Sequence, residues 1–285
     1  MNETQISEIV QRVLERLGSM ESHSEPARTP AENDASDIAA LDLRSQYLVD
    51  RPHDREAFLV LKEKTPARVG AGHVGARYRT ATMLRFMADH AAAQASVFSD
   101  VDDAFLARIG MRKYQTACTT RDEFLTRPDL GRAFSAETLG QIHAHTGADN
   151  QVVLYLADGL SSSAVRANAA DIIPVIQKGL EGYGVRVNKP FFVQYGRVGT
   201  MDALGDALGA DAVCVLLGER PGLVTADSMS AYLAYRPTVG MPESRRTVVA
   251  NIHRGGTPAV EAGAHIVDLI RLILKEQKSG VDLSI

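Results

Sequence analysis

Four polar or glycine-rich segments follow apolar runs in the second half of the chain, and they hold the residues best suited to contact a ligand. They are Ala157-Asp158-Gly159, Gly196-Arg197-Val198, Gly218-Glu219-Arg220 and His253-Arg254-Gly255-Gly256. Any one of them is explained equally well as a turn, because turns use Asp and Gly for their geometry. In a parallel sheet, however, the carboxyl ends of the strands meet at one edge, where open α/β sheets bind ligands. The four segments together predict a ligand site at that edge.

A glycine motif in the first half of the chain does not support nucleotide binding. Gly70, Gly72 and Gly75 match the G-x-G-x-x-G pattern of dinucleotide-binding loops. That pattern needs a buried strand directly before it, so that the turn directs a helix N-terminus at a pyrophosphate. The preceding residues 62–69 are charged and interrupted by Pro66. We expect a basic loop here, either solvated or in contact with a partner or an anionic group, and no NAD site.

The composition excludes several classes of protein. The chain has 31 Lys and Arg against 35 Asp and Glu, a net charge of −4, which argues against a nucleic-acid-binding surface. Cys118 and Cys214 are far apart and no His cluster has the spacing of metal ligands, so neither a disulfide framework nor a metal site is expected. No apolar run is long enough to span a bilayer, and the sequence has no secretory signal. We expect a cytoplasmic protein without nucleic-acid or membrane partners.

The residues from 151 onward alternate between apolar runs and amphipathic segments. The runs predict strands near residues 152–156, 191–193, 212–217, 230–235 and 247–252. Helices are predicted over 163–180, around Leu204 and Leu208, and from Thr257 or Pro258 onward. Uninterrupted apolar strands between helices are typical of a mostly parallel sheet that is covered on both faces. The expected fold class is α/β, with a mainly helical region at 39–150 and a Rossmann-like, mostly parallel sheet domain at 151–285.

Residues 1–18 have the pattern of a short amphipathic helix. Apolar residues recur at helical spacing and lie on one stripe: Ile6, Ile9, Val10, Val13, Leu14 and Leu17. Residues 19–38 are polar and acidic and predict a flexible linker. A helix this short is marginal alone in water, so its apolar stripe needs a partner. It either docks on its own domain or inserts into a groove on another protein, and the linker favours the second.

Five longer segments carry a resemblance to a known family. They are residues 125–132, 158–161, 190–198, 218–223 and 251–258. In these segments, and over nearly the whole chain from about residue 40, the sequence resembles the small subunit of ethanolamine ammonia-lyase, an adenosylcobalamin-dependent enzyme. The resemblance implies a complex with a large subunit that converts ethanolamine to acetaldehyde and ammonia through an adenosyl radical. In this family the large subunit holds the substrate and the catalytic residues, so no catalytic residue is expected in this chain.

The resemblance also implies which residues contact the cofactor. The family's cobalamin contacts correspond to Val198, Glu219 and Val248, and relatives have Cys at the last of these positions. Val198 and Glu219 follow predicted strands, at the sheet edge described above. Considered without the resemblance, Glu219 could be a turn carboxylate and the two valines could belong to the core.

A histidine segment approximates a cobalt-binding loop of other cobalamin proteins. Residues 251–256 resemble D-x-H-x-x-G, in which the His replaces the nucleotide base of the cofactor as the lower ligand of cobalt. Here Asn251 stands where the carboxylate that orients the imidazole would be. We therefore expect that His253 is not a cobalt ligand, that the protein supplies no metal ligand, and that the cofactor remains base-on.

The resemblance gives the N-terminal segment a possible role. Enzymes of this pathway are often enclosed in bacterial microcompartments, and residues 1–18 are similar to an encapsulation signal that binds a shell or cargo protein. Two other functions remain to be weighed against the enzyme subunit. A nucleotide-dependent oxidoreductase would need a true fingerprint after a strand, and a purely structural partner would assemble the enzyme without contacting the cofactor.

Overall fold

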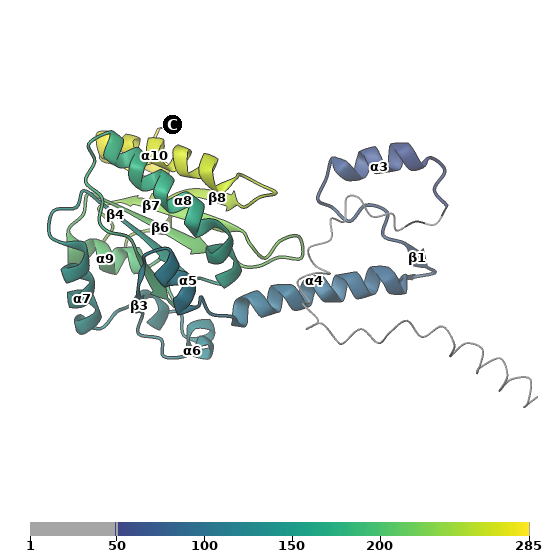
Figure 1. Ribbon diagram of the computed structural model, residues 1–285, viewed down its shortest axis with the longest axis horizontal. Coiled ribbons are helices and arrows are strands. Elements are labelled where there is room, and N and C mark those ends of the chain that lie inside the picture. Colours follow the sequence, from purple (N-terminus) through teal and green to yellow (C-terminus); the bar gives the residue numbers. More distant parts are fainter. Residues whose placement is uncertain (1–48, 50, 285) are drawn as a thin grey trace, which may run out of the picture. The chain divides into compact units, whose positions relative to one another are not determined.

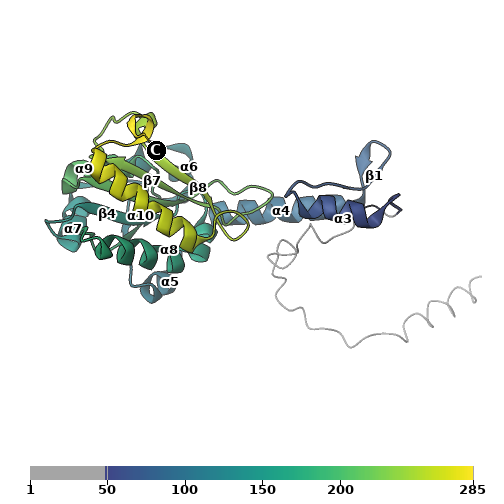
Figure 2. The same ribbon diagram turned by 90° about the horizontal axis from the view of Figure 1, so that it is seen from above.

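The structure is a computed structural model that describes residue 49 and residues 51–284 (Figures 1 and 2). These residues belong to one compact unit, Asp42–Ile285. The predicted helix at 1–18 and the predicted linker at 19–38 lie outside the described residues.

A six-stranded sheet forms the core of this unit, with the strand order β3-β5-β4-β6-β7-β8. The strands are β3 (Arg112–Gln115), β4 (Val152–Ala157), β5 (Phe191–Gln194), β6 (Ala212–Gly218), β7 (Met229–Tyr235) and β8 (Thr247–Ile252). The first four strands in this order are parallel, and β7 is antiparallel to both β6 and β8. The fold is thus α/β with a mostly parallel sheet.

Helices cover both faces of the sheet. The described residues contain α3 (Arg55–Glu63), α4 (Thr80–Phe98), α5 (Asp103–Arg108), α6 (Arg121–Thr126), α7 (Ala136–Thr146), α8 (Ser162–Gly182), α9 (Thr200–Leu208) and α10 (Ala259–Glu276). Short 3-10 turns occur at η1 (Leu130–Arg132), η2 (Glu243–Arg245) and η3 (Gly280–Asp282), and a small hairpin joins β1 (His73–Val74) to β2 (Arg77–Tyr78). Helices α8 and α10 pack together on one face, and α7 and α9 lie on the other (Figure 1).

Strand β4 shows why both faces are covered. Its six side chains are fully buried, and successive side chains of a strand point to opposite faces. Leu154 and Leu156 pack in the layer of α8 and α10, whereas Val153 and Tyr155 pack in the layer of α7 and α9. No helix in the described part of the chain is both long enough and apolar enough to cross a bilayer.

The elements predicted from residue 151 onward are confirmed with small shifts at their ends. Strand β8 has the predicted bounds, β4 and β6 are each one residue longer, and α10 begins directly after Pro258. In the region 39–150, where the sequence predicts mainly helix, the structure also contains β3 and the β1–β2 hairpin. Strand β3 has polar residues because it is an edge strand that pairs only with β5, and Arg112 and Lys113 are exposed.

The Rossmann-like description needs a correction. The chain connects β6 to β7 through residues 219–228 without a crossover helix, so β7 must return antiparallel. The strand order also differs from the order of two parallel halves that defines the dinucleotide-binding fold. What holds is a mostly parallel sheet with helices on both faces.

Candidate functional site

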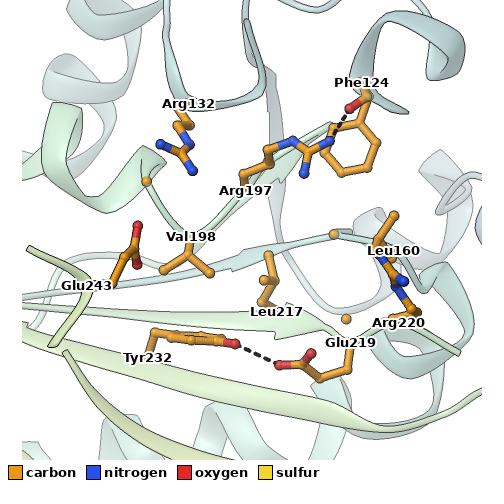
Figure 3. Close-up of a pocket in the computed structure, with 14 residues that line it drawn as sticks. Phe124, Arg132, Leu160, Arg197, Val198, Leu217, Glu219, Arg220, Tyr232 and Glu243 are labelled. Atoms are coloured by element: carbon orange, nitrogen blue, oxygen red, sulfur yellow. Dashed lines mark hydrogen bonds between the residues drawn. The ribbon is translucent and has the colours of Figure 1, made fainter. Parts of the chain in front are cut away.

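The strand order creates a crevice at the carboxyl ends of β4 and β6. After β4 the chain forms β5 on one side of it and then β6 on the other. Connections that leave neighbouring strands in opposite directions open a crevice where α/β sheets bind ligands. A cavity of about 470 Å³ lies here, and its wall includes residues of the turns after β4, β5 and β6 (Figure 3). Three of the four predicted segments therefore come together.

Two glycines allow β4 and β6 to approach closely at this point. A Cβ atom at Gly218 would overlap the carbonyl oxygens of Asp158 and Ser161. Gly159 has a φ of +54°, and a Cβ atom there would overlap the Gly218 carbonyl oxygen. That oxygen also accepts a hydrogen bond from the Leu160 N–H at 3.0 Å. The turns after β4 and β6 thus form one closely packed wall.

A buried aspartate forms an ion pair with Arg121 and joins two of the turns. Asp158 is fully buried, and its Oδ2 lies 3.0 Å from Nη2 of Arg121. Its Oδ1 accepts the Gly196 N–H at 3.1 Å, which connects the turns after β4 and β5. Burial raises the pKa of Asp158 to about 6, although Arg121 and the backbone N–H groups act in the opposite direction. Arg121 also stacks over Tyr195, 4.8 Å from the centre of the ring.

Glu219 is held by a tyrosine across the cavity floor. The hydroxyl of Tyr232 in β7 donates a hydrogen bond to Oε1 of Glu219 at 3.0 Å (Figure 3). Burial and the adjacent carboxylate raise the pKa of Tyr232 to about 12, so this hydroxyl stays protonated near neutral pH. The hydrogen bond fixes one carboxylate oxygen and leaves Oε2 as an acceptor for a ligand.

The other two predicted contacts differ in their positions. Val198 lines the cavity directly before Gly199, which caps the N-terminus of α9. Val248 does not line the cavity and is 46% exposed. It pairs with Tyr232 in the sheet register, so both side chains lie on the same face of the sheet. Val248 is therefore next to Tyr232, which lines the cavity.

The fourth predicted segment lies outside the cavity. His253 follows β8, and both of its ring nitrogens are used within its own turn. Nδ1 accepts the Gly255 N–H at 3.1 Å, which leaves the proton on Nε2 for the bond to Oδ1 of Asn251 at 2.8 Å. Asn251 thus orients the ring toward its own turn, where neither nitrogen is available to a metal.

The glycine motif at residues 70–75 lacks the context of a dinucleotide loop. No strand directly precedes it, because α3 ends at Glu63 and the intervening residues form turns and loop. The short strand β1 begins inside the motif, and β2 follows it instead of a helix. Across residues 51–284, no group of three His, Cys, Asp or Glu side chains is arranged to hold a metal ion.

Several cavity residues were not predicted from the sequence. Arg132, Tyr232 and Glu243 reach the cavity from η1, β7 and η2. Arg197 lies within one of the predicted segments, but the sequence predicts no role for it. The available signal was the repeated Gly-Arg pairing in the family segments, at Gly131-Arg132 and at Gly196-Arg197.

Comparison with known proteins identifies the family. A family model described as ethanolamine ammonia-lyase light chain (EutC) matches residues 55–284. The ethanolamine ammonia-lyase small subunit of Clostridium tetani is 52% identical over 293 residues, which cover 100% of this chain and 99% of that protein. The protein of the same name from Clostridium perfringens is 57% identical over 247 residues, 87% of this chain and 84% of that protein. The one from Listeria monocytogenes is 46% identical over 292 residues, 99% of this chain and 100% of that protein. The chain therefore belongs to the family of ethanolamine ammonia-lyase small subunits.

Proposed function

We propose that this chain forms one side of an adenosylcobalamin site in a complex with the large subunit of ethanolamine ammonia-lyase. The complex converts ethanolamine to acetaldehyde and ammonia. The observation that carries the proposal is the cavity at the ends of β4 and β6, because its wall contains Val198 and Glu219. Val248 lies on the same face beside it.

The cavity suits part of a corrinoid and not the whole molecule. A volume of about 470 Å³ is typical of a site for a single drug-sized ligand, which is smaller than a corrin ring with its nucleotide tail. A second chain must therefore cover the remaining surface of the cofactor. Glu219 offers Oε2 to the N–H groups of the peripheral amides of the corrin, and Val198 offers an apolar contact.

The chemistry of the reaction belongs to the cofactor and the large subunit. When bound, adenosylcobalamin supplies a cobalt–carbon bond whose homolysis provides the radical that removes hydrogen from the substrate. This chain holds and orients the corrinoid and keeps water from its covered face. Three arginines and two glutamates line the cavity, and this net positive lining disfavours the ammonium group of the substrate. We place substrate binding and catalysis in the large subunit.

The cofactor is proposed to bind with its own base on cobalt. Both ring nitrogens of His253 already have partners within residues 251–255, so cobalt ligation would require that turn to open. The carboxylate that would support a metal-bound imidazole is replaced by Asn251.

Substitutions on the cavity wall are expected to weaken corrinoid binding without preventing assembly. Glu219→Ala removes the acceptor held by Tyr232, and loss of a hydrogen bond to a charged group corresponds to roughly tenfold to hundredfold weaker binding. Val198→Asp places a carboxylate against an apolar ligand surface and should weaken binding at least as much. The measurement is titration of the reconstituted complex with cyanocobalamin, followed by visible absorbance.

A matched control separates the site from general effects of an added charge. Val239→Asp alters a valine that is 73% exposed and does not line the cavity, so corrinoid affinity should stay unchanged. Size-exclusion chromatography of each variant with the large subunit reports assembly. If Glu219→Ala and Val198→Asp bind cyanocobalamin normally, or only lose assembly, the chain is a structural partner and the proposal is wrong.

Residues 1–18 are proposed to direct the enzyme, within the cytoplasm, into a bacterial microcompartment by binding a shell or cargo protein. Ile9→Glu with Leu14→Glu interrupts the apolar stripe of the sequence pattern. The double variant should retain activity in the complex, while a fluorescent fusion changes from puncta to diffuse signal in cells. Puncta that persist at wild-type number and brightness would refute this role.

A further inference from the structure

Arg132 and Arg197 lie together on the side of the cavity opposite Glu219 (Figure 3). The backbone N–H of Arg197 donates to the carbonyl oxygen of Gly131 at 2.9 Å. Side-chain atoms of Arg197 lie 3.1 Å from the position that a Cβ atom of Gly131 would take, and those of Arg132 lie 3.0 Å from the corresponding position at Gly199. The side-chain stem of each arginine thus packs on a glycine of the other's turn, so the two side chains lie together in the cavity wall.

The carboxylates on this side form their hydrogen bonds and ion pairs with Arg246, and not with Arg132. Asp202 accepts hydrogen bonds from Arg246 on both oxygens, at 2.9 and 2.7 Å. Glu243 also forms an ion pair with Arg246. Among the residues that the structure describes, the Arg132 guanidinium has no hydrogen-bond or ion-pair partner, although it lines the cavity.

Arg197 also lacks an anionic partner in the described chain. Its Nη2 donates to the Phe124 carbonyl oxygen, and its guanidinium stacks 4.6 Å from the centre of the Phe124 ring. Its Nε is buried without a hydrogen-bond partner. Burial and the adjacent Arg132 lower the pKa of Arg197. Two cations are therefore held side by side, and the carboxylates on their side, Asp202 and Glu243, are already paired with Arg246.

The backbone beside these arginines is electropositive as well. Helix α9 begins at Thr200, its cap Gly199 provides no side-chain oxygen, and its positive end opens on the cavity. The N–H groups of Val198 and Gly199 donate to no acceptor within residues 51–284. Paired guanidiniums and free N–H groups at a helix N-terminus are the donors that proteins use for phosphate.

We infer that Arg132 and Arg197 bind a phosphate ester, namely the phosphodiester in the nucleotide tail of the corrinoid. The inference rests on the proposed function and deepens it. Among the molecules that the proposed reaction brings together, the corrin amides are neutral and the amino alcohol is a cation, so this phosphodiester is the anionic group. This assignment places the nucleotide tail at the turns after β5 and η1, with the corrin ring toward Glu219.

The test compares corrinoids that differ in their phosphate. The complex with the large subunit is titrated with cyanocobalamin, with cobinamide, which lacks the phosphate and the nucleotide, and with cobinamide phosphate. Arg132→Gln and Arg197→Gln should each weaken the binding of cyanocobalamin and of cobinamide phosphate roughly tenfold to hundredfold. Each should change the affinity for cobinamide by less than about twofold. Inorganic phosphate is a competitor in a further titration and should displace cobinamide phosphate far better than cobinamide.

Two features of the chain keep the test interpretable. The Arg197 side chain donates to the Phe124 carbonyl oxygen, so its loss could disturb the turn. The Arg132 side chain has no hydrogen-bond partner in the described chain, so Arg132→Gln is the cleaner variant. Arg108→Gln is the matched control, because Arg108 is exposed and does not line the cavity. The control substitution should change the affinity for all three corrinoids equally and only slightly.

The outcomes separate this inference from the proposed function. Equal weakening of cobinamide and cobinamide phosphate by Arg132→Gln would overturn the phosphate assignment while leaving the corrinoid site in place. Unchanged affinity for every corrinoid in both arginine variants would overturn it too. Failure of the wild-type complex to bind any of the three corrinoids would overturn the proposed function and this inference together.

Discussion

Replacing Asp158 with alanine is expected to lower the free energy of unfolding by about 3 kcal/mol, the lower end of the range for breaking a buried ion pair. The lower end applies because Arg121 keeps its second ion pair, with Asp100 at 2.7 Å. Asp158 is fully buried and Arg121, its partner at 3.0 Å, is 10% exposed. The substitution also removes the acceptor of the Gly196 N–H and so releases the turn that carries Val198. Urea denaturation of the full chain, followed by circular dichroism, measures the change.

Three controls show whether the buried charge is the cause. Asp158→Asn keeps an oxygen that can accept from the Gly196 N–H, so its free energy of unfolding should lie between those of Asp158→Ala and the wild type. Adding Arg121→Met to Asp158→Ala should lower the free energy of unfolding by less than the sum of the single changes, because no buried charge is then left unpaired. The second partner of Arg121, Asp100, is 49% exposed. Asp149→Ala breaks an exposed pair with Arg186 and should change stability by about 0–1 kcal/mol. A change below about 1 kcal/mol for Asp158→Ala would contradict this account.

Replacing Gly218 with alanine should disrupt the cavity wall itself. The added methyl group would overlap two backbone carbonyl oxygens, those of Asp158 and Ser161, and backbone cannot rotate away as a side chain can. We expect a loss near the upper end of the roughly 1–3 kcal/mol range for overpacking, together with loss of cyanocobalamin binding by the complex. Denaturation of the full chain and corrinoid titration of the complex measure the two effects separately.

Gly222 provides the matched control for this substitution. It lies four residues later in the same loop, and a Cβ atom there would meet no other atom within 4 Å. Gly222→Ala should therefore leave corrinoid affinity unchanged and keep stability within about 1 kcal/mol of the wild type. Equal effects at the two glycines would show that the close contact between β4 and β6 does not shape the cavity.

The sheet was largely predictable because its strands are buried on both faces. Strand β4 has no polar residue over Val152–Ala157, and both faces need apolar side chains. The antiparallel direction of β7 does not follow from the strand's own residues, because Met229–Tyr235 is equally suited to a parallel strand. The direction depends on the connection at 219–228, where the sequence predicts no helix and the structure has none.

The candidate site was predictable in part. Glu219 and Val198 follow apolar strands, and chain topology brings such positions to one edge. Val248 lies within β8, so no strand-end rule could place it. Arg132 lies 66 residues before Val198 in the sequence, and only the packing of Gly131 and Gly199 against the two arginines brings the two turns together. A close approach of this kind depends on three-dimensional packing that local sequence patterns do not encode.

A structure of the small and large subunits assembled with cyanocobalamin tests the central claim most directly. We expect the corrin ring to contact Val198 and Glu219 at the ends of β5 and β6, with the phosphodiester beside Arg132 and Arg197. A corrinoid enclosed by the large subunit alone, with no atom in contact with these turns, would contradict the account.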